Sequence, residues 1–169
     1  PYLVAQCGAA FVKGLQGIGN SYLDENHVAA TLKHYAVHSQ PEGGRNLSPG
    51  NYSERIIREN FLYPFEVAVK EANPSCVLAS YNEVDGIPGH AHHGLLTSIL
   101  RDEWGFDGYV ISDLTGIDQL FNKHFVANDS ADAAIMAMNA GIDMELPGQI
   151  TCFYSLAEAI RKGDFDESI

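Results

Sequence analysis

The sequence predicts an α/β fold built from parallel βα units, and two observations support this prediction. Four short apolar runs are continuous rather than alternating, which is typical of strands that are buried on both faces. Stretches with the apolar spacing of amphipathic helices separate these runs, and strands that alternate with helices form parallel sheets.

The first elements can be placed from the amino end. Residues 1–17 form a helix, residues 27–38 contain the first strand, and a loop rich in Gly and Pro follows over residues 39–51. A second helix starts at Ser53, and we expect Pro64 to break or kink it because proline donates no backbone hydrogen bond. An apolar stripe runs along the first helix and is expected to face the core: Leu3, Val4, Cys7, Phe11, Val12 and Leu15.

The rest of the chain continues the same alternation. In order, we expect a strand at 76–81, an exit loop at 82–91, a helix at 93–104, a strand at 109–112, a short helix near 116–121, a helix at 129–140 capped by Asp129 or Ser130, a strand at 141–146 and a helix at 152–162.

The length bears on how such a sheet closes. A closed barrel of eight βα units takes about 250 residues, or about 31 per unit, so a chain of this length corresponds to about five units. Only four strands are visible among the 169 residues. We therefore expect a partial (β/α)8 TIM-type barrel, in which residues 1–169 form a single incomplete domain.

Composition excludes several classes of protein. Ten Lys and Arg residues against 22 Asp and Glu residues give a net charge of −12, which argues against a nucleic-acid partner. A hydrophobic content of 46% supplies a real core. No apolar run approaches the roughly 18 residues of a membrane span, so no membrane partner is expected. The three cysteines are far apart, which fits buried thiols better than a disulfide framework.

Polar residues follow three of the predicted strands, where folds of this class place their sites. These residues are the pairs Lys33–His34, Tyr81–Asn82 and Ser112–Asp113. Each also has a purely structural explanation, such as Asp113 capping the next helix. The coincidence of three polar strand ends at one edge favours a functional site.

The chemistry of that site is narrowed by what the sequence lacks. It contains no GxGxxG fingerprint after a strand and no Walker loop, so no cofactor is expected. His90, His92 and His93 form the only metal-like cluster, and no carboxylate or cysteine spacing completes a tetrahedral set. A metal-dependent hydrolase is therefore a weak alternative. A lone Asp113 beside cationic and hydrogen-bonding groups suits a nucleophile, and glycoside hydrolysis is the reaction that most often uses one in this way.

The pair Lys33–His34 raises a geometric problem. Consecutive side chains of a regular strand point to opposite faces of the sheet, so the two cannot both reach one ligand. We therefore predict a bulge, a cis peptide or an irregular strand end at this pair.

Two stretches resemble a known family. VLASYNEVDGIPGHAHHGLLTSILRDEWGFDGYVISD, residues 77–113, closely resembles the nucleophile region of family 3 glycoside hydrolases, the β-glucosidases, β-xylosidases and their relatives. AATLKHYAVHSQPEGGR, residues 29–45, resembles the Lys-His sugar-binding segment of the same family. Residues 53–72 and 133–146 also match, so the resemblance covers essentially the whole chain and places it in the latter part of the family's N-terminal barrel domain.

The resemblance implies roles for individual residues. Asp113 matches the nucleophile that forms the covalent glycosyl intermediate, and Tyr81 matches the tyrosine beside it. Lys33 and His34 match the pair that hydrogen-bonds the hydroxyls of the sugar before the cleaved bond, and Arg45 matches a loop arginine contacting that sugar. Lys33, His34 and Arg45 would then supply cationic donors around the Asp113 carboxylate.

The resemblance also implies an activity and a setting. It implies a retaining β-glycosidase that removes non-reducing β-D-glucosyl or β-D-xylosyl residues from an oligosaccharide or glycoside, in the periplasm or outside the cell. The general acid/base would come from the rest of the chain, in a following sandwich domain. Glu42, Glu83 and Asp85 are local carboxylates without motif support.

Two departures from the family pattern stand out. Leu114 replaces the Trp that many members carry after the nucleophile, and the loop after Lys33–His34 lacks the Asp-Ser-His sequence of the family's N-acetylglucosaminidases. A non-catalytic sugar-binding or structural fragment is the alternative function.

Overall fold

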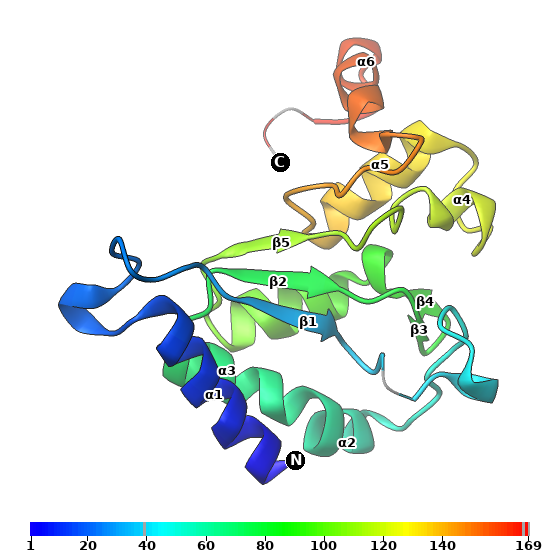
Figure 1. The fold of residues 1–169 in the computed structure, drawn as a ribbon. Helices are drawn as coiled ribbons and strands as arrows, with labels where there is room; N and C mark the ends of the chain where they lie inside the picture. Colours follow the sequence, from blue (N-terminus) through cyan, green and yellow to red (C-terminus); the bar gives the residue numbers. More distant parts are fainter. Residues whose placement is uncertain (39, 167, 169) are drawn as a thin grey trace.

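The computed structural model describes residues 1–38, 40–166 and 168, and it confirms the α/β class with parallel strands. Strands β1, β2 and β5 lie side by side with their arrowheads at one end, and helices pack against them (Figure 1). No helix within the described ranges has the length and apolar character to cross a membrane.

The sheet has the order β1-β2-β5, with Thr31–Tyr35, Cys76–Ala79 and Tyr109–Ile111 as its strands. Both pairings are parallel, and Leu32, Val77 and Val110 occupy one row across the sheet. The expected fourth strand is reduced to a single parallel bridge between Ile111 and Met144. The reason is local: the Asp143 side chain accepts the Val110 N–H at 2.6 Å and takes the place of a backbone partner.

The helices lie close to their expected positions. Pro64 does not break the helical segment that begins after Ser53; a widened π-helical turn precedes the proline and the helix continues. Asp129 caps α5 by accepting backbone N–H bonds with its side chain. The helical elements are α1 (Tyr2–Gln16), η1 (Gly19–Ser21), η2 (Glu42–Gly44), α2 (Glu54–Ile56), η3 (Ile57–Leu62), α3 (Tyr63–Ala72), η4 (Gly89–Ala91), η5 (Gly94–Glu103), α4 (Gln119–Asn122), α5 (Ser130–Ala140), η6 (Cys152–Ser155) and α6 (Leu156–Lys162).

The segment expected to be an exit loop after β2 contains a β-hairpin. Its strands β3 (Glu83–Val84) and β4 (Ile87–Pro88) are antiparallel. Asp85 and Gly86 connect them, both with positive φ, as a two-residue hairpin turn requires. The dipeptide Asp-Gly was therefore a readable signal for this hairpin.

The expected apolar stripe of α1 was wrong for Leu3, Val4, Cys7 and Phe11, which are exposed, whereas Val12 is buried as expected. The buried side of the helix carries small residues, among them Ala5 and Ala9, and these allow α1 to pack closely against α3 (Figure 1). Leu3 and Phe11 lie on the exposed side, and the Cys7 thiol is exposed as well, whereas the other two cysteines are buried as expected.

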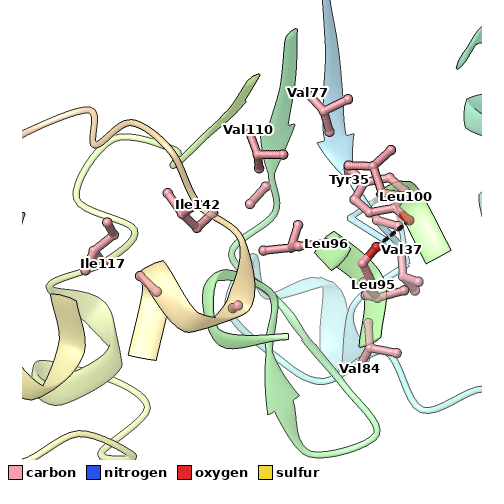
Figure 2. Close-up of a cluster of buried hydrophobic side chains, with 14 of the residues drawn as sticks. Tyr35, Val37, Val77, Val84, Leu95, Leu96, Leu100, Val110, Ile117 and Ile142 are labelled. Carbon is pink, nitrogen blue, oxygen red and sulfur yellow. Dashed lines mark hydrogen bonds between the residues drawn. The ribbon is translucent and has the colours of Figure 1, made fainter. Parts of the chain in front are cut away.

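The core lies between the sheet and its helices (Figure 2). Val77 and Val110 of the strands and Leu96 and Leu100 of η5 are fully buried. The Tyr35 ring is buried among them, and its hydroxyl donates to the Leu95 carbonyl at 3.1 Å.

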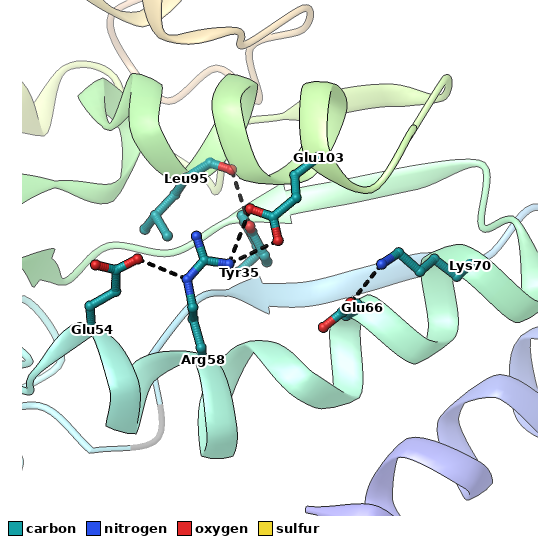
Figure 3. A network of polar contacts seen from close by, with 7 residues as sticks. All are labelled: Tyr35, Glu54, Arg58, Glu66, Lys70, Leu95 and Glu103. Carbon is teal, nitrogen blue, oxygen red and sulfur yellow. Dashed lines mark hydrogen bonds and ion pairs between the residues drawn. The ribbon is translucent and has the colours of Figure 1, made fainter.

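A surface network ties the helical segment before α3 to η5. Arg58 donates to Glu54 and to Glu103, each at 2.9 Å, so it joins two helices that lie far apart in the sequence (Figure 3). A second pair, Lys70 and Glu66, lies one turn apart along α3 (Figure 3). Exposed pairs of this kind contribute little to stability.

Gln16, the last residue of α1, lies at the amino ends of β1 and β2, opposite the strand ends that carry Lys33, His34 and Asp113. Its side chain is buried; Oε1 accepts the backbone N–H groups of Ala30 and Ser75, and Nε2 donates to the Asn73 carbonyl. One amide thereby satisfies backbone groups that precede β1 and β2.

We expect Gln16→Leu to lower the free energy of unfolding by about 3 kcal/mol, because it leaves buried backbone N–H groups without a partner. Urea unfolding of the full-length protein measures the loss. Gln6→Leu, at a partly exposed position of the same helix, is the control and should change stability by less than about 0.5 kcal/mol. Equal losses in the two variants would contradict the assignment.

Candidate active site

The three polar strand ends meet at the carboxyl edge of the sheet. Lys33 and His34 belong to β1, Tyr81 follows β2 and Asp113 follows β5. His34 Nε2 lies 3.6 Å from Asp113 Oδ2, and the Tyr81 hydroxyl donates to the Leu114 carbonyl at 2.6 Å. The structure therefore brings His34, Tyr81 and Asp113 together.

Asp113 is held by the tight turn that follows β5. Its Oδ1 accepts the Leu114 N–H at 2.7 Å, and its carbonyl accepts the Gly116 N–H at 2.9 Å. Thr115 has a left-handed φ of 59°, which reverses the chain at this point. The side chain is partly buried, with 16% of its surface exposed. The carboxylate is thus fixed in place while remaining accessible.

The prediction of an irregular strand at Lys33–His34 is confirmed. The peptide bond between them is cis, as is that between Tyr35 and Ala36, and the pairing of β1 with β2 shifts register between Leu32 and Tyr35. Lys33 and His34 both line one cavity of about 530 Å³, whose other walls include α1 and the helical residues 60–68, and Asp113 does not line it.

His34 differs in charge from our expectation. Burial lowers the pKa of its imidazole below the usual value, the neighbouring His38 lowers it further, and Asp113 opposes the change. The His38 ring lies 4.2 Å from that of His34, centroid to centroid. The lowered pKa favours the neutral imidazole at neutral pH, whereas the sequence led us to expect a cationic donor.

Tyr81 joins the two strand ends through its hydroxyl. Burial raises the pKa of this phenol, and the Asp113 carboxylate raises it further, so the group stays protonated and can donate. Leu114, whose carbonyl receives that bond, is 54% exposed. An aliphatic side chain thus lies at the rim beside Asp113.

The three clustered histidines do not converge on a metal. His90 Nε2 accepts the backbone N–H of Asp113 at 2.9 Å, whereas His92 Nδ1 accepts the Leu95 N–H at 3.2 Å. His93 Nδ1 lies 3.5 Å from the Ser98 hydroxyl. Across residues 1–38, 40–166 and 168, no group of three His, Cys, Asp or Glu side chains is arranged to hold a metal ion. The arrangement gives the metal-hydrolase alternative no support.

Arg45 lies elsewhere. It is exposed and lines a separate cavity with Lys123 and His124. Within the part of the chain that the structure describes, His34 is the one basic side chain within 4 Å of the Asp113 carboxylate. A contact between Arg45 and a sugar stays a prediction.

The sequence did not point to His124, which contacts the backbone of Tyr81. Its Nδ1 lies 2.9 Å from Glu83 Oε1, and its Nε2 lies 3.1 Å from the Tyr81 carbonyl oxygen. The ring thereby ties the segment after α4 to the β3 hairpin. No motif marks this residue, because the two positions are 41 residues apart in the sequence.

The end of β2 also fixes the chain after β1. The Ala36 carbonyl accepts hydrogen bonds from the Ser80 hydroxyl at 2.9 Å and from Asn82 Nδ2 at 3.3 Å, and both side chains are fully buried. Asn82, which the sequence offered as a polar strand end, thus supports the Lys33–His34 segment rather than facing the cavity.

The local carboxylates are engaged away from Asp113. Glu42 accepts a bond from Asn51, Glu83 pairs with His124, and Asp85 occupies the exposed hairpin turn.

Comparisons with known proteins agree on one family. A family model described as the glycosyl hydrolase family 3 N terminal domain matches residues 1–169. A β-xylosidase of Formosa agariphila is 45% identical over 146 residues, covering 86% of this chain and 20% of the relative. β-Glucosidase B of Emericella nidulans is 41% identical over 148 residues, covering 88% of this chain and 15% of the relative.

The fold agrees with a solved structure as well. A mutant β-glucosidase of Listeria innocua, in complex with laminaribiose, is 34% identical and superposes with a TM-score of 0.91. The match covers 99% of this chain and 23% of that one. This chain therefore spans about a fifth of the length of the relatives it matches.

Because His90 is buried, we expect the free energy of unfolding to depend on pH. Burial lowers the pKa of its imidazole to about 4, so the folded protein holds the ring neutral while the unfolded chain protonates it near pH 6.5. The unfolded state then binds more protons between these values, and the stability conferred at neutral pH is lost as pH falls from about 6.5 to 4, by roughly 3 kcal/mol for this group.

Urea unfolding of the full-length protein at pH 7.5 and 5.0 checks this, with His90→Gln as the non-titrating comparison. The loss of stability on acidification should be smaller in the variant, because the variant lacks the His90 imidazole. It should not vanish, because His34 and His92, whose pKa values are also lowered, remain in both proteins. An identical loss in both proteins would contradict the prediction.

Proposed function

The chain belongs to family 3 of the glycosyl hydrolases, and from this premise we propose that it carries the nucleophile of a retaining β-glycosidase. The observation that carries the proposal is the placement of Asp113 at the carboxyl edge of the sheet, with His34 at 3.6 Å and the Tyr81 hydroxyl bonded to the next residue. A barrel of this class places its catalytic groups at that edge.

The proposal includes the domain. Residues 1–169 form the later part of a (β/α)8 N-terminal catalytic domain, a single incomplete domain whose remaining strands belong to the rest of the chain. The parallel order β1-β2-β5 and the bridge to Met144 supply consecutive strands of such a barrel. The coverage of about a fifth of each relative supports the same assignment.

Asp113 acts as the nucleophile. The Leu114 N–H holds Oδ1, which leaves Oδ2, on the His34 side, to attack the anomeric carbon of the sugar. The new bond forms between Oδ2 and that carbon while the bond to the leaving oxygen breaks, and the leaving oxygen takes a proton from a general acid. Water then cleaves the glycosyl ester and regenerates the carboxylate.

The sugar lies at the carboxyl edge of the sheet, beside the Asp113 carboxylate and the His34 ring, which are 3.6 Å apart. The Lys33 ammonium donates to a hydroxyl, and the neutral His34 ring either donates or accepts. Hydroxyl contacts that tighten as the ring flattens stabilise the oxocarbenium-like transition state. Tyr81 holds the turn beside the nucleophile, and a contact of the sugar with Arg45, which lines a separate cavity here, would require the loop after η2 to move.

The general acid/base comes from another part of the chain. Glu42 and Glu83 are bonded to other side chains, and Asp85 occupies the hairpin turn. The substrate is a glycoside or oligosaccharide with a non-reducing β-D-glucosyl or β-D-xylosyl residue, since relatives named for both activities match over most of this chain. The aliphatic Leu114 at the rim forms part of the surface that meets the leaving group.

We expect Asp113→Asn in the full-length protein to lower kcat/KM for a 4-nitrophenyl β-glucoside or β-xyloside by on the order of 10⁴-fold, because the amide is a poor nucleophile. Release of nitrophenol under steady-state conditions measures the change. Asp107→Asn is the matched control and should keep full activity, because this exposed carboxylate precedes the amino end of β5, whereas Asp113 follows its carboxyl end. Retention of most activity by Asp113→Asn would remove this residue as the nucleophile.

If the wild-type protein binds sugar and hydrolyses neither glycoside, the sugar-binding alternative replaces the proposal.

We expect Tyr81→Phe to lower kcat/KM by about fivefold, because the turn beside Asp113 loses one hydrogen bond worth about 1 kcal/mol. The same assay measures the effect. Tyr109→Phe, at a half-exposed tyrosine at the start of β5, is the control and should stay within about twofold of wild type. An unchanged Tyr81→Phe enzyme would show that the bond to Leu114 does not support catalysis.

A further inference from the structure

His90 lies beneath Asp113 and contacts its backbone rather than its carboxylate. The residue belongs to the short η4 turn, 23 positions before Asp113, and its side chain is fully buried. Its Nε2 accepts the Asp113 N–H at 2.9 Å. The backbone nitrogen of Asp113, the proposed nucleophile, is therefore held by a side chain from a different βα unit.

The hydrogen bond defines the chemical state of the ring. A backbone N–H is always a donor, so Nε2 must present its lone pair and the proton of the neutral ring must be on Nδ1. Burial keeps the pKa of this imidazole at about 4, so the acceptor is available throughout the neutral range. The neutral ring can therefore accept the Asp113 N–H at neutral pH.

The surroundings hold the ring in this orientation. A Cβ atom added at Gly116 would lie 2.2 Å from His90 Nε2 and 2.4 Å from its Cε1, so the glycine leaves the space that the ring occupies. The Tyr81 ring lies 5.9 Å from the His90 ring, centroid to centroid. His90 is thus wedged between the turn that carries Asp113 and the tyrosine that holds Leu114.

We propose that His90 is a positioning residue for glycosyl transfer to Asp113, holding the backbone of the nucleophile through Nε2. This inference rests on the proposed function. His90 fixes the Asp113 N–H, Tyr81 fixes the Leu114 carbonyl, and the Leu114 N–H fixes Oδ1. These three bonds leave the carboxylate little freedom, and a displacement of about 1 Å in a reacting group can cost about 100-fold in rate.

Two variants of the full-length protein separate the hydrogen bond from packing. His90→Leu fills much of the space without an acceptor, whereas His90→Gln offers an amide oxygen to the Asp113 N–H. We expect His90→Leu to lower kcat for a 4-nitrophenyl β-glycoside by about 30-fold, with the KM and the inhibition constant of the free sugar changed less than about threefold. His90→Gln should recover activity to within about threefold of wild type.

A second measurement is independent of turnover. Hydrogen–deuterium exchange of the peptide that contains Asp113 should speed up in His90→Leu and stay slow in His90→Gln. Leu100→Ala, in the core helix η5, is the stability control, and it should lower the melting temperature without changing kcat well below that temperature. If His90→Leu does not fold, His90→Met takes its place, since the flexible thioether packs adaptably and is a weak acceptor.

The outcomes distinguish this inference from the function it rests on. Equal losses in His90→Leu and His90→Gln would show that the ring only fills space, and full activity in His90→Leu would show that the bond is unnecessary; either result overturns the inference while Asp113→Asn remains inactive. If Asp113→Asn is as active as wild type, the proposed function fails, and the positioning role fails with it.

Discussion

Parallel hydrogen bonding of β1 to β2 and of β2 to β5 is the constraint on which the candidate site depends. Because all three strands run the same way, the residues that follow them are delivered to one edge of the sheet, although they are 80 positions apart in the sequence. The register places Leu32, Val77 and Val110 in one row, in which both valines are fully buried and Leu32 is partly buried against the core. Core packing therefore helps to determine the distances between the groups of the candidate site.

At that edge, backbone groups that follow the strands form hydrogen bonds with side chains instead of with neighbouring strands. Ser80 and Asn82 bind the Ala36 carbonyl after β1, His90 binds the Asp113 N–H after β5, and the Ser112 hydroxyl accepts the Leu146 N–H. Each of these side chains is fully buried, where an unpaired backbone group would be costly. The irregular strand ends that expose Lys33, His34 and Asp113 are stable because their backbone groups are satisfied in this way.

The sequence predicted what depends on local periodicity and failed where tertiary contacts decide. The order of helices and strands, the Asp129 cap and the irregularity at Lys33–His34 follow from short-range rules. The stripe of α1 failed in part because the buried side of the helix carries Ala5 and Ala9, whereas larger residues such as Phe11 are exposed. Asp113 was found by its place after a strand, but His90 was read as a weak metal candidate, because its contact depends on a turn 23 residues away.

The contact between Gly116 and His90 has an evolutionary consequence. A side chain at position 116 is sterically incompatible with an imidazole at position 90, because its Cβ would enter the ring. A lineage that replaced the ring with a smaller group would be free to lose the glycine, whereas loss of the glycine alone would be selected against. The two positions should therefore covary among homologues.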